Sequence, residues 1–262
     1  MSKGLFTREP KLNRISISQI NMYDRCPEQY RQRYILGRKI PPSGLMLQGS
    51  VYHQAHAENF KQKITTMKDL STSDMADAYA TFWDRGIDNN PNYSRDEIVW
   101  EEEPRKVKDE GYFLLNLYHT TISSTIIPKE VETEKTKVIN RDLDAVGILD
   151  LIKVDDVIVD HKVSRRSQSQ QDVDRDLQPS MYLWINDKEQ FEFHRAVNKK
   201  NPEIQILKTK RSQQQRERFV EMIKNIYALI QTGIFVPRCD TFWCSKNFCG
   251  YFEICKARLN VY

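Results

Sequence analysis

The sequence predicts an α/β fold in which a helical N-terminal lobe precedes a small sheet and further helices follow it. Apolar residues recur at helical spacing through the first half of the chain. The spacing changes to alternation near residue 130, and a long amphipathic stretch covers about 212–232. Helices, then strands, then helices are typical of a domain in which helices cover a sheet.

The composition is that of a folded chain with a small excess of positive charge. Of 262 residues, 39% are hydrophobic, which excludes wholesale disorder. The 40 Lys and Arg against 36 Asp and Glu give a net charge of +4, which is compatible with a polyanionic partner without requiring one. No apolar run approaches the roughly 20 residues that span a bilayer. The polar start lacks the apolar region of a secretory signal, so an intracellular protein is expected.

Helices are predicted through the N-terminal half, after a polar arm at residues 1–15. Ser18 is a candidate N-cap for a short helix over 19–25, and Pro27 can open a second helix because proline fits the first turn. Three further helices are predicted over about 46–64, 73–87 and 97–125. These elements predict a helical lobe over 16–128.

Residues 129–236 are predicted to contain the sheet. Residues 130–138 alternate, and the apolar runs 145–154 and 157–159 flank turn residues, which predicts a hairpin. A polar loop at 164–171 follows. The remaining predicted elements are a helix near 173–187, strands at 190–197 and 204–208, and a helix over 212–232 that ends at Gly233. The last segment, 237–262, is rich in cysteine and aromatic residues.

The predicted hairpin carries two carboxylates and a lysine. With a three-residue turn at 154–156, Asp150 lies directly opposite Asp160 on one sheet face, about 5 Å away. Lys162 follows Asp160 by two residues and therefore points to the same face. A two-residue turn would shift the register by one residue and remove this arrangement.

Two close carboxylates repel each other unless a cation lies between them. Their oxygens suit Mg²⁺ or Mn²⁺, and a nearby lysine can orient or help deprotonate bound water, or neutralise a phosphate. These groups are suited to phosphodiester hydrolysis. The alternative is a charged strand tip with a solvated salt bridge.

The order of several small motifs resembles the RecB-like branch of the PD-(D/E)xK nuclease superfamily. That branch includes CRISPR-associated RecB-like exonucleases, AddB-type nuclease domains and phage relatives. Its pattern is G-x-x-x-H on a helix, G-x-x-D and D-x-K on strands, and Q-x-x-x-Y on a helix. The matching pairs are Gly49 and His53, Gly147 and Asp150, Asp160 and Lys162, and Gln178 and Tyr182. The resemblance implies a restriction-endonuclease-like core, a small mixed sheet flanked by helices.

The resemblance also implies roles for these residues. His53, Asp150 and Asp160 would bind the metal ion, and Lys162 would assist the attacking water. Gln178 and Tyr182 would support the site or contact the nucleic acid. We include His161, which replaces the usual aromatic residue between Asp and Lys, among the candidate metal ligands. Glu132 matches a strand glutamate that is common in these proteins.

Five cysteines in a chain without an export signal favour reduced thiols or metal ligation over disulfides. Cys244, Cys249 and Cys255 form C-x4-C-x5-C, and Cys26 stands far upstream. Four thiolates hold either Zn²⁺ or an iron–sulfur cluster, and the uneven spacing favours the cluster. Cys239 can replace Cys26 in such a set. Small buried core cysteines are the remaining alternative.

The segment from Ser18 through Cys26-Pro27 to Tyr30 resembles the N-terminal ligand segment of iron–sulfur nucleases in this branch. Their other three cysteines lie at the C-terminus. The resemblance favours Cys26, Cys244, Cys249 and Cys255 as ligands of a 4Fe–4S cluster, with Zn²⁺ as the alternative. Such a cluster would join the two ends of the chain and remove unfolded-state entropy, which is a structural role.

Nucleic acid is the expected partner. Arg165 and Arg166 are candidate phosphate contacts because they closely follow Lys162. We predict a metal-dependent DNA nuclease, an exonuclease on single-stranded DNA or duplex ends, acting in DNA recombination, repair or replication. The first alternative keeps the fold and cluster but binds nucleic acid without cutting it. The second is a zinc-stapled interaction subunit of a recombination or replication assembly.

Overall fold

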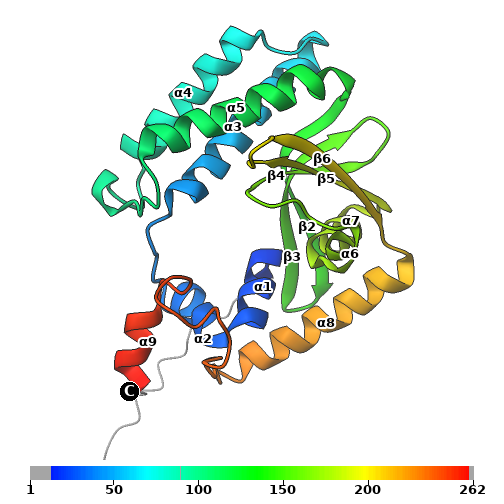
Figure 1. The fold of residues 1–262 in the computed structure, drawn as a ribbon. Coiled ribbons are helices and arrows are strands. Elements are labelled where there is room, and N and C mark those ends of the chain that lie inside the picture. Colours follow the sequence, from blue (N-terminus) through cyan, green and yellow to red (C-terminus); the bar gives the residue numbers. More distant parts are fainter. Residues whose placement is uncertain (1–12, 89, 260–262) are drawn as a thin grey trace, which may run out of the picture. The chain divides into compact units, whose positions relative to one another are not determined.

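The computed structural model describes residues 13–88 and 90–259, with side chains described as far as residue 255. It divides into two compact units. The terminal unit consists of residues 1–40, 136–146 and 218–262, and the central unit consists of residues 41–135 and 147–217. Each unit is assembled from segments that are far apart in the sequence (Figure 1).

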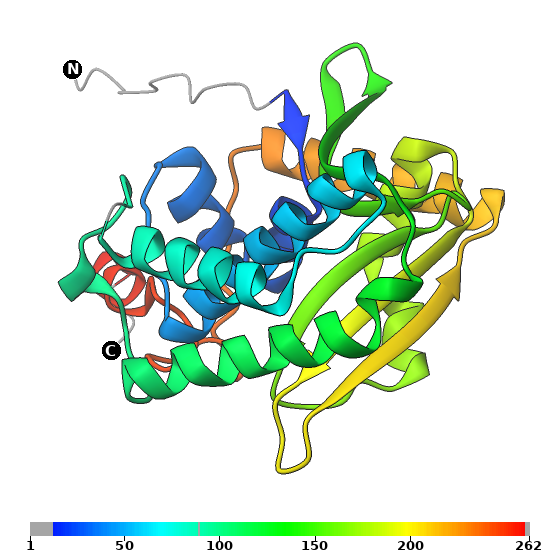
Figure 2. The same ribbon diagram turned by 90° about the horizontal axis from the view of Figure 1, so that it is seen from above.

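Three long helices form one layer of the central unit: α3 (Gly44–Thr66), α4 (Thr72–Asp88) and α5 (Pro104–Thr121). All three pack against one another, as Figure 2 shows, around buried apolar side chains such as Val51, Tyr79 and Leu114. The expected helix over 97–125 is too long. Helix α5 begins at Pro104, which fits only the first turn, and the Glu103 side chain accepts a hydrogen bond from Lys106 N. Short 3₁₀ turns at Arg95–Glu97 and Ser123–Thr125 account for the flanking residues.

The strands are β2 (Pro128–Asn140), β3 (Leu143–Lys153), β4 (Ile158–Ser164), β5 (Gln190–Val197) and β6 (Glu203–Lys210). In the central unit, β3 and β4 are antiparallel, β4 and β5 are parallel, and β5 and β6 are antiparallel. The expected small mixed sheet is therefore confirmed. Strand β2 pairs with β3. Helix α3 packs on β4 and α5 on β5 and β6.

The hairpin register determines which side chains can meet. Leu151 lies opposite Val159, and Lys153 N donates to Val157 O at 2.9 Å. Residues 154–156 therefore form the three-residue turn that the sequence indicates. Asp156 adopts a φ of 65°, a left-handed conformation that closes the turn. Continuing this register by one residue places Asp150 opposite Asp160.

The helix expected near 173–187 is two helices, α6 (Gln170–Arg175) and α7 (Leu177–Asn186). Asp176 between them is extended, and its carboxylate accepts from Gln178 N at 2.8 Å, capping α7. The buried Arg211 holds this break by donating to the carbonyl oxygens of Val173 and Asp176. Gln178 consequently lies in the first turn of α7.

The terminal unit contains β1 (Arg14–Ile15), α1 (Ile17–Arg25), α2 (Pro27–Tyr30), the π-helical turn η1 (Arg31–Ile35), most of α8 (Gln213–Gln231) and α9 (Phe252–Leu259). The N-cap of α1 is Ser16, not Ser18, because Ser16 and Gln19 form a reciprocal capping box. Of the predicted arm, residues 1–12 lie outside the described residues. Arg14–Ile15 pair in parallel with the start of β3, and Ile15 is fully buried.

Among the described residues, the structure contains no helix with the length and apolar character needed to cross a membrane.

Candidate active site and cysteine site

Strand β4 presents Asp160 and Lys162 on one sheet face. Lys162 Nζ lies 2.8 Å from Asp160 Oδ2, and Gln178 Nε2 donates a hydrogen bond to Asp160 Oδ1. Asp160 is only 3% exposed, so these two partners replace water at its two oxygens. The carboxylate is thus held between a strand lysine and a helix amide.

Asp150 on β3 lies across the hairpin from Asp160 and joins it to helix α3. His53 Nδ1 lies 3.0 Å from Asp150 Oδ2, and the backbone N–H of His161 donates to the same oxygen at 2.8 Å. His53 therefore reaches the site from α3. The structure brings together all four of these expected positions: the two aspartates, the histidine and the lysine.

Glu132 completes a group that can hold a metal ion. The ligand atoms of His53, Glu132 and Asp150 all lie within 4.8 Å of one another. Two carboxylates and one imidazole form a donor set that suits Mn²⁺ and also accepts Mg²⁺. Glu132 adopts a φ of 49° inside β2, where a non-glycine residue is strained by on the order of 1–3 kcal/mol. The strained residue is thus one of the candidate metal ligands. The alternating sequence pattern of the strand does not predict this backbone conformation.

The electrostatics of the site are set by burial and by opposite charges. Burial alone would lower the pKa of His53, but the Asp150 carboxylate raises it above its usual value. Burial opposes ionisation of Asp150, yet His53 keeps the Asp150 pKa below its usual value. Burial raises the pKa of Asp160. Burial disfavours the Lys162 ammonium, but Asp160 raises its pKa, so Lys162 is charged at neutral pH.

His161 contacts Asp150 through its backbone more closely than through its ring. The ring Nδ1 lies 3.8 Å from Asp150 Oδ2, and Nε2 lies 3.3 Å from the Tyr118 hydroxyl. The imidazole stacks on His56 at 4.6 Å between centroids and is 2% exposed. The structure therefore places the His161 ring in a buried aromatic cluster, outside the group formed by His53, Glu132 and Asp150.

Tyr182 lies beside the carboxylates and packs against Gly147. Burial, followed by the negative charge of Asp160, raises the pKa of Tyr182, so its hydroxyl stays protonated. A Cβ added at Gly147 would meet Tyr182 Cε1 at 2.8 Å. The glycine of the G-x-x-D motif thus provides the space in which this ring approaches β3.

The two motif glycines are expected to respond oppositely to alanine. Gly147→Ala would displace the buried Tyr182 ring and lower the free energy of unfolding by about 1–3 kcal/mol. At Gly49, inside α3, an added Cβ meets nothing within 4 Å. Gly49→Ala should therefore raise the free energy of unfolding by about 0.5–1 kcal/mol. Urea unfolding of both variants is the measurement, and destabilisation by Gly49→Ala would contradict the open space at that position.

Some of the arginines near the site already have polar partners within the protein. Arg165 forms an ion pair with Glu102, and Arg166 is exposed. No sequence pattern identifies Arg195 as a residue of the site. Its position on β5 lies directly beside Lys162 on β4, and its guanidinium donates to Gln168. Arg195 and Lys162 become neighbours because β4 and β5 pair in parallel. The register of that pairing cannot be predicted from the sequence.

The buried imidazole of His56 makes the protein sensitive to acid. Neither ring nitrogen has a hydrogen-bond partner among the described residues, and burial lowers the pKa of His56 well below its usual 6.5. Below about pH 6.5 the His56 imidazole is protonated in the unfolded chain but stays neutral in the folded chain. The contribution of neutral His56 to the free energy of unfolding is complete above that pH. It falls by about 1.4 kcal/mol per pH unit below it.

His56→Phe should make the free energy of unfolding less steeply dependent on pH in the acid range, by the equivalent of one proton. Urea midpoints of wild type and variant, measured across the acid range, test this expectation. Because His161 and His194 also have lowered pKa values through burial, a residual slope should remain. Identical slopes for the two proteins would show that His56 does not contribute.

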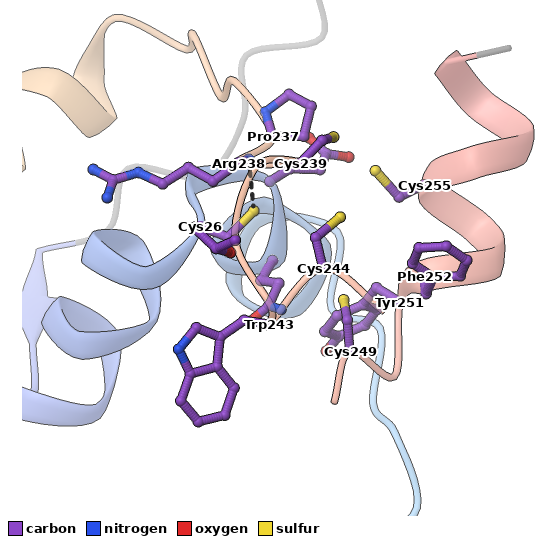
Figure 3. Close-up of a pocket in the computed structure, with 13 residues that line it drawn as sticks. Cys26, Pro237, Arg238, Cys239, Trp243, Cys244, Cys249, Tyr251, Phe252 and Cys255 are labelled. Atoms are coloured by element: carbon purple, nitrogen blue, oxygen red, sulfur yellow. Dashed lines mark hydrogen bonds between the residues drawn. The ribbon is translucent and has the colours of Figure 1, made fainter. Parts of the chain in front are cut away.

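All five cysteines line one pocket of the terminal unit (Figure 3). Cys26 comes from the junction of α1 and α2, Cys255 from α9, and the other three from the loop between α8 and α9. Arg238 N donates to Cys26 Sγ at 3.5 Å. The structure therefore brings the distant Cys26 to the C-terminal cysteines, and it brings Cys239 there as well.

The thiols of this pocket disfavour one another's ionisation. Burial, followed by a hydrogen bond with Cys239, raises the pKa of Cys244 to about 11. Burial, followed by the charge of Glu28, raises the pKa of Cys255 to about 11. Thiolates collected this closely need a cationic centre among them, so the donor set fits a thiolate-bound metal centre.

Comparison with known proteins identifies a family for this chain. A sequence model of the PD-(D/E)XK nuclease superfamily matches residues 14–256. The crystal structure of a protein from Eubacterium rectale named "Putative exonuclease" shares 12% identity, with a TM-score of 0.57 over 90% of this chain and 88% of that chain. The crystal structure of SSO0001 shares 16% identity over 95% of this chain and 89% of that chain, with a TM-score of 0.45. No curated protein matches the sequence. Because the superfamily model covers nearly the whole chain and the aspartate and lysine positions converge on one sheet face, this protein belongs to the PD-(D/E)XK nuclease superfamily.

Proposed function

We propose that this protein is a metal-dependent deoxyribonuclease of the RecB-like branch. It acts as an exonuclease on single-stranded DNA or duplex ends, in DNA recombination, repair or replication. One observation carries the proposal. Asp150, Asp160 and Lys162 meet on one sheet face, and His53 and Glu132 add metal-binding atoms to it.

The candidate ligands for Mg²⁺ or Mn²⁺ are His53, Glu132 and Asp150. Asp160, a further ligand that the resemblance implies, lies opposite Asp150 in the hairpin register. A divalent ion held there would supply Lewis acidity for the phosphate and would lower the pKa of bound water. Lys162 stays an ammonium and favours negative charge on the phosphate, while it orients the attacking water rather than taking its proton. Gln178 fixes the carboxylate of Asp160. Tyr182, whose hydroxyl stays protonated, would support the site or contact the nucleic acid.

Arg165, Arg166 and Arg195 are the proposed phosphate contacts around this centre. Arg195 lies beside Lys162 in the sheet, and its buried Nε has no hydrogen-bond partner among the described residues. Arg165 would exchange its ion pair with Glu102 for a phosphate. Guanidinium groups match the geometry of phosphate oxygens, which favours this role.

The cysteine site is proposed to hold a 4Fe–4S cluster through Cys26, Cys244, Cys249 and Cys255. Zn²⁺ is the alternative occupant, and Cys239 is the alternative to Cys26. The five thiols around one pocket support a thiolate-bound centre, and the resemblance of the Cys26 segment to iron–sulfur nucleases supports the cluster. Its role would be structural, because it joins α1, α9 and the loop between α8 and α9.

End-labelled single-stranded DNA tests the proposed activity. Wild type should shorten it with Mn²⁺ or Mg²⁺ and leave it intact in EDTA, and Asp150→Asn should not cut. A covalently closed single-stranded circle of similar composition should resist cleavage, because an exonuclease needs an end. Cutting of the circle would show an endonuclease. A metal-loaded wild type that cuts neither substrate would favour a non-cleaving nucleic-acid-binding subunit.

A further inference from the structure

Three aromatic side chains gather on the surface of the terminal unit beside the cysteine pocket. Phe242 is 66% exposed, Trp243 37% and Phe248 56%. We name these three residues the aromatic platform. Trp243 also lines the cysteine pocket, and Figure 3 shows its indole directed away from the cysteine sulfurs. Apolar side chains exposed together as a contiguous patch are typical of a ligand-binding or interaction surface.

The platform is ordered by its own contacts. The ring centroids of Phe242 and Trp243 are 4.4 Å apart, and Phe248 lies 5.6 Å from each. Backbone hydrogen bonds from Cys244 N to Thr241 O and from Cys249 N to Ser245 O hold the intervening loop at 2.9 and 2.8 Å. The rings are therefore presented as a group rather than as three independent side chains.

An exposed guanidinium lies against the platform. The Arg25 guanidinium carbon lies 5.0 Å from the centroid of the Trp243 ring, a cation–π contact. Arg25 and Arg238 are both exposed. The segments of the terminal unit contain 17 Lys and Arg against 8 Asp and Glu, a net charge of +9, while those of the central unit have a net charge of −5. The small net charge of the whole chain is therefore the sum of a basic terminal unit and an acidic central unit.

Exposed rings with guanidinium groups beside them are the combination that binds single-stranded nucleic acid. Bases stack on the rings irrespective of sequence, and the cations neutralise the backbone. We propose that the aromatic platform and Arg25 form a binding surface for single-stranded DNA in the terminal unit, which does not contain the candidate catalytic carboxylates. This inference rests on the proposed nuclease function and adds a second, non-catalytic contact with its substrate.

Leucine substitutions separate base stacking from general apolar docking. Phe242→Leu/Phe248→Leu keeps apolar volume but removes two π-faces. Binding of fluorescent oligodeoxythymidine would be followed by anisotropy in an Asp150→Asn background, so that the DNA stays intact. We expect affinity to fall at least about ten-fold, since each stacked base contributes about 1–3 kcal/mol. Arg25→Gln should also make the salt dependence shallower by about 0.7 for one lost phosphate contact.

The matched control is Ile234→Ala/Val236→Ala, which removes exposed aliphatic groups of the same unit, 65% and 63% exposed. Its affinity should stay within about two-fold of the parent. All variants must retain the metal content and absorption of the cysteine site, which confirms that the unit is folded. Unchanged affinity in the double leucine variant would overturn the proposal, as would an equal loss in the aliphatic control.

The same series distinguishes this inference from the nuclease proposal. If wild type does not cleave but the leucine variant loses DNA affinity, the platform stands and the nuclease assignment fails. If wild type cleaves and the leucine variant binds normally, the nuclease stands and the platform fails.

Discussion

Replacing Lys162 by methionine is expected to slow metal-dependent DNA cleavage by about 10²–10⁴-fold, the usual contribution of a positioned proton-transfer or electrostatic group. The ammonium lies 2.8 Å from Asp160 Oδ2 and is the cation nearest to that buried carboxylate. Methionine keeps the apolar stem but removes the charge that would face the phosphate. It also removes the charge that most lowers the Asp160 pKa, so that pKa should rise further.

Two control variants separate charge from geometry. Lys162→Arg keeps the charge but not the compact ammonium, so it should recover only part of the rate. Lys153→Met alters a lysine of β3 whose ammonium lies 3.2 Å from Glu192, and its rate should stay close to wild type. Single-turnover cleavage of a labelled oligonucleotide, with affinity measured separately in Ca²⁺, makes the comparison. A Lys162→Met enzyme as fast as wild type would place the chemistry elsewhere.

The parts of the site that the sequence predicts are those fixed by short-range geometry. The three-residue turn at 154–156 decides that Asp150 faces Asp160, and the two-residue strand period places Lys162 beside them. Helical spacing likewise puts Gln178 and Tyr182 on one face of α7. These relations need only local periods and one turn length, which single-sequence patterns contain.

The parts that escape prediction depend on backbone conformation or on pairing between distant segments. Nothing in an alternating strand shows that Glu132 takes a left-handed conformation and joins His53 and Asp150. The neighbour relation between Arg195 and Lys162 requires the register of β4 with β5, two strands separated by two helices. The buried setting of His161 depends on its packing against α3 and α5, which the D-x-K motif does not specify.

The cysteines illustrate the same limit, because spacing cannot choose among five thiols around one pocket. Cys26→Ser is expected to lose the metal centre, while Cys239→Ser should retain it. Both positions line the pocket, where Cys26 is partly buried and Cys239 is exposed. They differ in chain position. Cys26 alone connects the N-terminal helices to the C-terminal loop, and 217 residues separate it from Cys244.

Closing so long a loop should contribute about 5 kcal/mol by the chain-entropy relation used for disulfides. Loss of the centre in Cys26→Ser should therefore lower the thermal midpoint strongly, whereas Cys239→Ser should change it little. The measurements are made on anaerobically purified protein. They are the iron, sulfide and zinc content, the absorption spectrum and the midpoint of thermal unfolding. Iron and sulfide near four per chain would support the cluster. A colourless protein with one zinc would instead assign the site to Zn²⁺. A variant pair with the reverse pattern would exchange Cys26 for Cys239 as the fourth ligand, and the centre would then close only the local C-terminal loop.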